Sequence, residues 1–296
     1  MEMKLIKGNT FYLNPRLIDI GAYRIKNKQF VLIDTGYEKT AKTEIIPFLD
    51  SSKMTVDGIL CTHGHLDHIG GNYLIKNRYS SKIASPYIES IFGENSYNMY
   101  MVRNNFRFSV TKEKFSKFNC PVDCVIKPNQ DTFTFLGIPF KTIPLNGHSP
   151  NQLGYITPDN VAYLADAIMC EKLINKTKIP YIFDLNKDIE SKKSLKNLNC
   201  DYYVISHDGV YDDISKLIDI NLSYIENTID CLINLMKHPS SFDDYTTFVM
   251  NKMNIKPSVK KIVYIQEILK NFITYFLQKD LVDAFEHNGK IMLVKK

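Results

Sequence analysis

The stretch that decides the fold is Thr62-His63-Gly64-His65-Leu66-Asp67-His68-Ile69-Gly70-Gly71, which directly follows an apolar run. It places three of the seven histidines of the chain and one carboxylate close together. His63 and His65 are two positions apart, so in extended backbone they project to one side and can reach the same metal ion. Asp67 and His68 lie on the turn that follows and aim at a neighbouring position. The pattern predicts a metal site at the end of a buried strand.

Three further residues with metal-binding side chains also follow apolar runs. His148 lies in an Asn-Gly-His-Ser-Pro sequence, His207 in Ser-His-Asp-Gly, and Asp166 in Leu-Ala-Asp-Ala. A metal needs more than two protein ligands to be held tightly. His148 can complete the first position, His207 can complete the second, and Asp166 can bridge both through one carboxylate.

This ligand set predicts two divalent metal ions. Imidazole and carboxylate ligands suit Zn²⁺ best and also tolerate Fe or Mn. Two cations about 3.5–4 Å apart can hold a hydroxide between them and stabilise developing oxyanion charge. Asp67 is placed to hold a metal and also to orient or deprotonate the metal-bound water. The expected chemistry is metal-assisted hydrolysis of an ester, thioester, amide or phosphodiester.

These residues, in this order, resemble the five motifs of the metallo-β-lactamase superfamily. The resemblance implies an α/β fold, a four-layer αβ/βα sandwich with two metals at one edge. It implies a catalytic role for Asp67 and makes Asp34, in the first motif, a support for the metal loops. The implied metal ligands are His63, His65, Asp67, His68, His148, Asp166 and His207. Ala165 stands where the family usually has glycine, and Asn146 where proline is common, but neither departure removes a ligand.

Strand-like and helix-like segments alternate around these motifs, which predicts layered α/β architecture. Residues 38–49 and a segment from Gly70-Gly71 toward Lys76 are predicted helices. Strands are predicted at residues 30–36, 56–61, 132–135, 138–143, 154–157, 161–164 and 202–206.

The pattern changes past residue 213. Apolar residues from Ile214 to Met236 step by three and four, which predicts one long amphipathic helix. A second helix is predicted from Ser241, with Asp244 completing an imperfect capping box, and a third after Ser258. Asn288-Gly289 between two apolar runs predicts a β-hairpin.

We therefore expect a metallo-β-lactamase-like catalytic domain over residues 1–213 and a helical, winged-helix-like C-terminal module over 214–296. Within the first, residues 86–128 carry many aromatic side chains with little periodicity. That stretch is interpreted either as an aromatic lid over a pocket or as an inserted helical piece that packs on the domain or on a second subunit.

The composition sets limits on location and partners. The chain has a mild net charge of +5 and six scattered cysteines, which do not form the spacing of a disulfide framework. It has no run of about 18 apolar residues, and its N-terminus lacks the features of a secretion signal. The expectation is a cytoplasmic protein with no membrane partner. A homodimer is compatible with the aromatic stretch and the amphipathic tail.

The ligand set resembles the glyoxalase II-like and lactonase-like branches of the superfamily. That resemblance favours a small-molecule thioester, ester or lactone as substrate. The helical tail resembles the β-lactamase-like 2 group, which includes single-strand RNA endonucleases, so an RNA substrate is the alternative. Scarce arginine and mixed surface charges favour the small molecule over RNA. An inactive metal-binding scaffold is a third interpretation, against which the complete ligand set argues.

Overall fold

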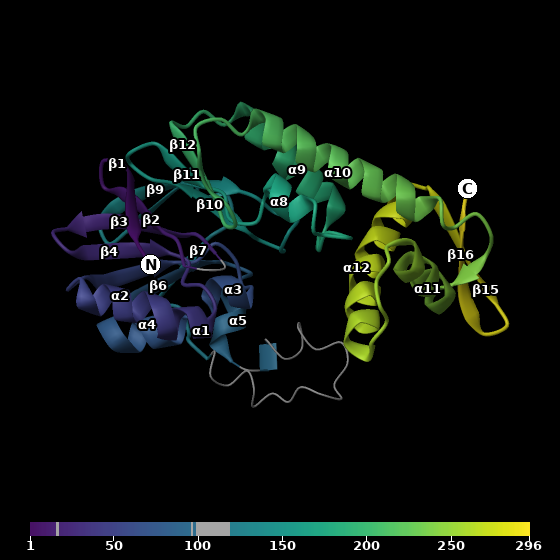
Figure 1. Cartoon of the computed structure of the whole chain (residues 1–296), viewed down its shortest axis with the longest axis horizontal. Coiled ribbons are helices and arrows are strands. Elements are labelled where there is room, and N and C mark those ends of the chain that lie inside the picture. The colour runs from purple at the N-terminus through teal and green to yellow at the C-terminus, as the bar shows by residue number, and fades with distance from the viewer. Residues whose placement is uncertain (16–17, 96, 99–118) are drawn as a thin grey trace.

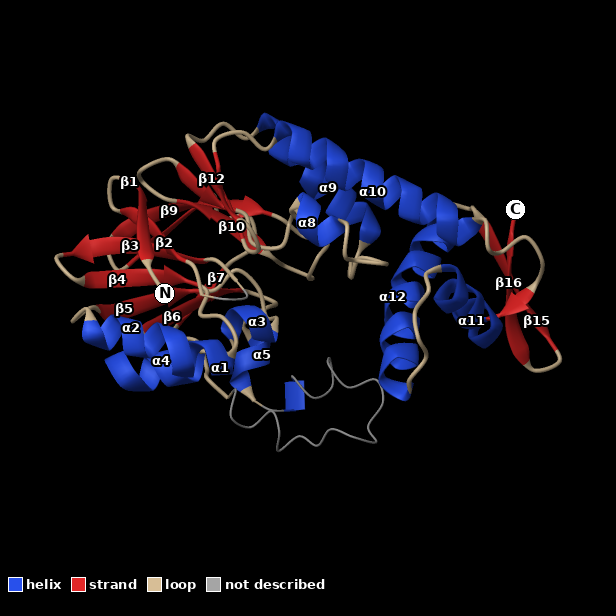
Figure 2. Ribbon diagram, viewed as in Figure 1, coloured by secondary structure: helices blue, strands red, loops and turns tan. Residues whose placement is uncertain are grey.

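The computed structural model describes residues 1–15, 18–95, 97–98 and 119–296. Two β-sheets pack face to face, and helices cover the outer face of each sheet (Figure 1, Figure 2). The predicted αβ/βα layering is confirmed, and the predicted C-terminal module of helices and a hairpin follows it along the chain.

The first sheet contains seven described strands in sequence order, and those from β4 to β7 run parallel. Its strands are β1 (Met3–Lys7), β2 (Thr10–Leu13), β3 (Ile20–Lys26), β4 (Gln29–Ile33), β5 (Thr55–Leu60), β6 (Lys82–Pro86) and β7 (Cys124–Ile126). Parallel strands place their carboxyl ends at one edge, so the loops after β4, β5 and β6 are neighbours.

The second sheet has the strand order β13-β12-β11-β10-β9-β8. Its strands are β8 (Thr132–Phe135), β9 (Ile138–Pro144), β10 (Leu153–Ile156), β11 (Val161–Tyr163), β12 (Tyr202–Ile205) and β13 (Gly209–Tyr211). β11 and β12 pair in parallel, so the loops that follow them also meet at one edge.

Three apolar cores hold these layers together. Between the sheets, Val31 and Leu60 pack in one cluster with Phe140 and the fully buried Tyr155. A second cluster joins the outer face of the first sheet to its helices, and a third joins the outer face of the second sheet to its helices. The burial of both faces of β4 and β5 explains why their sequences are continuous apolar runs.

The helices predicted at residues 38–49 and from Gly70-Gly71 toward Lys76 are present, the first with one interruption, whereas the polar helix Leu185–Ser194 was not predicted. The predicted helix at 38–49 contains a π-helical turn, η1, just before Pro47, whose ring nitrogen cannot donate a helical hydrogen bond. The helices of the sandwich are α1 (Glu38–Thr40), η1 (Ala41–Ile45), α2 (Ile46–Ser51), α3 (Leu66–Ile69), α4 (Asn72–Tyr79), α5 (Ile91–Glu94), α8 (Glu171–Ile174), α9 (Leu185–Ser194) and the 3₁₀ turn η2 (Leu195–Asn197).

The C-terminal part has its own apolar core, to which the segment before α9 also contributes. Ser241 accepts a hydrogen bond from the backbone of Asp244 and donates one to its carboxylate, so the predicted cap is present. The elements are α10 (Ser215–Ile233), β14 (Ser240–Ser241), α11 (Phe242–Lys252), α12 (Val259–Gln278), β15 (Val282–His287) and β16 (Lys290–Lys295). The last two strands form the predicted hairpin.

The aromatic stretch predicted at residues 86–128 lies in large part outside the described residues. Its described part includes Phe92 on α5, which is buried in the core beneath the first sheet. Among the described helices, none combines the length and the apolar character needed to cross a bilayer.

Candidate metal centre

The predicted ligands lie where strands end. His63, His65, Asp67 and His68 follow β5 in the first sheet, while Asp166 and His207 follow the parallel strands β11 and β12 in the second. His148 is on the loop between β9 and β10. A backbone hydrogen bond from Leu153 to the carbonyl of Thr62, 3.0 Å long, joins the two sheets beside this cluster. The structure thus brings all seven predicted ligands to one edge of the sandwich.

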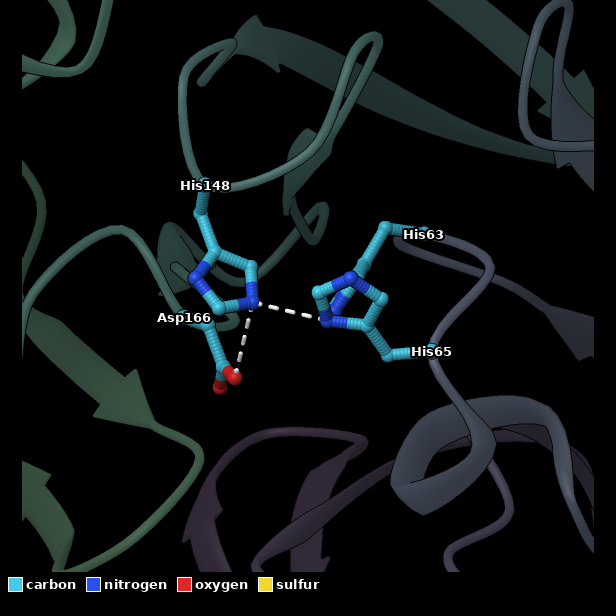
Figure 3. A group of neighbouring side chains, drawn as sticks. All are labelled: His63, His65, His148 and Asp166. Carbon is cyan, nitrogen blue, oxygen red and sulfur yellow. Dashed lines mark hydrogen bonds and ion pairs between the residues drawn. The ribbon is translucent and has the colours of Figure 1, made fainter. Parts of the chain in front are cut away.

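The first group consists of His63, His65, His148 and Asp166. One ligand atom from each lies within 4.8 Å of the others. Figure 3 shows the three rings and the carboxylate meeting in one small volume. Nε2 of His148 is 2.9 Å from Nδ1 of His65 and 3.3 Å from Oδ2 of Asp166. Three nitrogens and one oxygen match a four-coordinate zinc site in type and number.

The second group consists of Asp67, His68, Asp166 and His207, by the same distance criterion. Asp166 belongs to both groups, because Oδ2 faces His148 while Oδ1 lies 3.3 Å from Nε2 of His68. Oδ1 is also 3.7 Å from Nε2 of His207. One carboxylate is therefore placed between two adjoining sets of donors.

Asp34 lies behind the second group, where it is buried. Its Oδ2 accepts hydrogen bonds from Nδ1 of His68 and from the hydroxyl of Thr62, each 2.7 Å long. Since the Thr62 hydroxyl donates to Asp34, its oxygen accepts from Nδ1 of His63, 3.0 Å away. Both rings thereby present Nε2 to the site, which is how carboxylates behind metal-binding histidines orient them.

Buried polar atoms at the centre indicate that a cation fits there. Nε2 of His63, Nε2 of His68 and Oδ1 of Asp166 are buried and have no hydrogen-bond partner within the described part of the chain. Such atoms cost roughly 1–3 kcal/mol each when left unsatisfied. A divalent ion in each group would bind all three, and imidazole with carboxylate is a donor set that Zn²⁺ accepts. The residues therefore fit metal ions at both positions.

Burial and neighbouring charges shift the pKa values of the histidines at the centre. Burial lowers the pKa of His63 well below its usual range, and neighbouring imidazoles lower it further, so its ring is neutral. Burial also opposes charge on His68, but the carboxylates of Asp166 and Asp34 outweigh it and raise the pKa of His68 well above its usual range. The carboxylates thus create a negative potential that favours a cation between the rings.

Glu89 is a buried carboxylate that the motifs did not reveal. It lies on the loop after β6, and its Oε2 accepts a hydrogen bond from the backbone of Gly64, 2.9 Å away. Its Oε1 accepts from the hydroxyl of Ser149 and the backbone of Asn151, each at 2.8 Å. One side chain therefore joins the histidine loop after β5 to the loop that carries His148.

Asp19, just before β3, is a second buried carboxylate, and it fixes the loop of His207. Its Oδ2 accepts hydrogen bonds from the backbone of Asp208 at 3.1 Å and of Gly209 at 2.6 Å. Its own backbone donates to the carbonyl of Ser206. The sequence signal for Glu89 and Asp19 is weak, because each adjoins a strand that the apolar pattern did not predict.

The fold and the paired His/Asp groups define a metal-dependent hydrolase. The chain belongs to the metallo-beta-lactamase superfamily, whose family model matches residues 15–207 and so includes every predicted ligand. This confirms the resemblance drawn from the motifs.

Similar proteins cover most of the chain. Hydroxyacylglutathione hydrolase GloC of Haemophilus influenzae is 25% identical over 73% of this chain and 94% of its own length. Hydroxyacylglutathione hydrolase 1 of Vibrio vulnificus is 24% identical over 75% of this chain and 74% of its own. A beta-lactamase domain protein from Burkholderia ambifaria, 12% identical, matches the fold with a TM-score of 0.74 over 100% of this chain and 94% of that chain. A metallo-beta-lactamase family protein from Thermus thermophilus, 13% identical, gives a TM-score of 0.69 over 94% of each chain.

Proposed function

We propose that this chain is a dinuclear metal-dependent hydrolase that acts on a small-molecule thioester, ester or lactone. The observation that carries the proposal is that Asp166 is shared by two groups of donors. Each group contains four residues that can bind a metal ion. The similarity to two relatives named hydroxyacylglutathione hydrolase supports a small-molecule substrate.

The proposed roles divide among the residues of the two groups. His63, His65 and His148 would hold one ion, His68, Asp67 and His207 would hold the other, and Asp166 is the residue shared by both groups. The chemistry that divalent ions would supply here is acidification of water and stabilisation of negative charge on the substrate carbonyl oxygen. Asp34 keeps Nε2 of His68 directed at the site through its hydrogen bond to Nδ1. Asp67, whose side chain is 23% exposed, orients the attacking water and accepts its proton.

Metal analysis combined with a substrate panel tests this proposal. The protein is expected to contain two equivalents of divalent metal, mostly zinc, and to hydrolyse at least one member of a thioester, ester and lactone panel. Asp67→Asn is expected to lower kcat by about 10²–10⁴-fold, the usual contribution of a positioned base, with a smaller loss of metal. Asp212→Asn, the same change at an exposed aspartate past β13, is the control.

The RNA alternative is tested in the same preparation with a labelled single-stranded RNA. If the proposal is right, the wild-type protein does not cleave the RNA in a reaction that requires both metal and Asp67. RNA cleavage of that kind, together with no turnover of the small-molecule panel, would replace the proposed substrate with RNA. A protein that binds no divalent metal would contradict both.

A further inference from the structure

A cavity of about 180 Å³ lies beside the candidate ligands. At one end it is lined by His148, Asp166 and His207, so it reaches both groups of donors. The remaining wall is mainly apolar. Its aliphatic members are Ile168, Met169, Leu173, Ile182 and Ile225.

The two charged residues in the wall, Asp188 and Lys192, are paired with each other. Nζ of Lys192 donates to both carboxylate oxygens of Asp188, at 2.6 and 2.7 Å, and both residues are almost fully buried on α9. Because their opposite charges cancel, this buried ion pair presents no net charge to a ligand in the cavity. Beyond the end that holds the donors, the wall of the cavity is therefore mainly apolar and also includes Thr177 and Tyr181.

Both parts of the chain build this wall. Leu173 is on α8 and Ile225 is on α10, which packs against α8 and α9 (Figure 1). Ile225 and Ile182 also belong to the apolar core of the C-terminal helices. The C-terminal helices thus form one side of a chamber that opens on the catalytic centre.

We propose that this cavity binds the acyl group of the substrate, and that the substrate is an ester or thioester with an apolar acyl chain of about six carbon atoms. This inference rests on the proposed function. A cavity of about 150 Å³ lined by aliphatic side chains holds a benzene molecule. The cavity here is slightly larger, so it has room for a chain of that size with its carbonyl group at the donor end.

The reaction that follows from this placement is ordinary acyl hydrolysis. The oxygen of water forms a bond to the acyl carbon, and the C–O or C–S bond to the leaving group breaks. One proton of the water goes to the leaving alkoxide or thiolate, and the other is released as the carboxylate product forms. The acyl chain stays in the apolar cavity while the leaving group extends away from it.

A series of p-nitrophenyl esters tests the chain-length preference on the zinc-loaded protein of residues 1–296. Each buried methylene is expected to raise kcat/KM about fourfold. Hexanoate has four more methylenes than acetate, so the ratio of their kcat/KM values is expected to be about 250-fold, and decanoate is expected to fall below hexanoate because it exceeds the cavity.

Leu173→Phe narrows the cavity from its half-buried edge. It is expected to lower the hexanoate-to-acetate ratio about tenfold, the effect of one to two methylene groups. Leu222→Phe is the matched control. Leu222 is also half-buried, but it packs on the core outside the second sheet rather than in the cavity wall, so the ratio is expected to stay at the wild-type value.

Equilibrium binding of hexanoate and acetate to the same protein separates this inference from the proposed function. Hexanoate is expected to bind more tightly than acetate, and Leu173→Phe is expected to reduce the ratio of the two dissociation constants about tenfold. Equal binding of the two acids, or turnover that does not depend on chain length, would overturn the inference. Tighter hexanoate binding without turnover of any ester, thioester or lactone would keep the cavity as an acyl site and overturn the proposed function.

Discussion

His65 contributes a ligand atom to the first group only, and His207 contributes to the second group only. If the two groups hold separate ions, His65→Ala and His207→Ala each remove about one of two metal equivalents. Activity is expected to fall by more than ~100-fold in each, since even outer partners of metal ligands are worth ~10–100-fold. Elemental analysis and steady-state kinetics measure both effects.

The control for these variants is the alanine substitution of His238, a histidine outside both groups, between α10 and β14. It is expected to retain both equivalents and the wild-type rate. Two equivalents in all three variants would show that the assignment of ligands is wrong.

Glu89 provides the second prediction at the residue scale. Glu89→Gln preserves shape but replaces one acceptor oxygen with an NH₂ group. In either orientation that group faces a backbone N–H, of Gly64 or of Asn151. One buried donor is left unsatisfied, which costs about 1–3 kcal/mol. The metal affinity of the first position is expected to fall about 10–100-fold, measured by competition with a chelator.

Ser149→Ala is the graded comparison, because it removes the hydrogen bond from the Ser149 hydroxyl to Glu89 and leaves those from the backbone of Gly64 and Asn151 in place. Its loss of metal affinity is expected to be smaller. If Glu89→Gln lowers the free energy of unfolding but leaves metal affinity intact, Glu89 stabilises the fold without positioning the ligands.

The candidate ligands could be predicted from sequence because metal-binding side chains at strand ends are recognisable types in a recognisable order. Glu89 and Asp19 could not. Their partners are mostly backbone N–H groups, which every residue except proline has, and these lie as far as 62 and 190 positions away in the chain. Residue types therefore contain no signal for such pairs.

At the scale of elements, β4 and β5 were predictable from their apolar runs, whereas the edge strands β1 and β13 were not. β4 and β5 are continuous apolar runs because both faces are covered. β1 lies at the edge of the first sheet with mostly exposed residues, and β13 at the edge of the second is only half-buried throughout. Edge strands bury too little surface to produce an apolar run. The sequence pattern misses them for that reason.

The polar helix α9 was also missed, yet it supports the loop of His148. Gly147 has φ +125°, and a Cβ there would lie 2.2 Å from the backbone nitrogen of Asp188 on α9. The carbonyl of Gly147 accepts hydrogen bonds from the backbone of Phe183 and Asp184, where α9 begins. This close approach requires glycine at position 147.

Gly147→Ala is therefore expected to reduce stability by more than backbone strain alone, which costs about 1–3 kcal/mol, and to weaken metal binding at the first position. Gly137→Ala is the matched control. Gly137 also has positive φ, +81°, but a Cβ there meets nothing within 4 Å. Urea unfolding compares the two variants, and equal losses would show that the contact with α9 is unimportant.

At the scale of the molecule, the sequence predicted α10 but not what it packs against. Leu217 and Ile218 near its start pack in the core outside the second sheet, while Ile225 and Leu232 pack in the core of the C-terminal helices. Apolar periodicity defines the buried face of a helix and does not identify the partner of that face. The predicted boundary at residue 213 therefore coincides with the start of a helix that serves both parts.

Chelation of the metal tests how these parts are coupled. A ligand that binds only the folded state at a thousand times its Kd adds about 4 kcal/mol of stability, so removal of zinc is expected to lower Tm and re-addition to restore it. Hydrogen exchange is expected to rise in the ligand loops at 62–69, 146–151 and 206–209. Protection in α11 is expected to stay unchanged, because its core contains none of the candidate ligands. Equal loss of protection in α11 would mean that α10 transmits the metal-dependent order to the whole chain, and an unchanged Tm would mean that no metal is bound tightly.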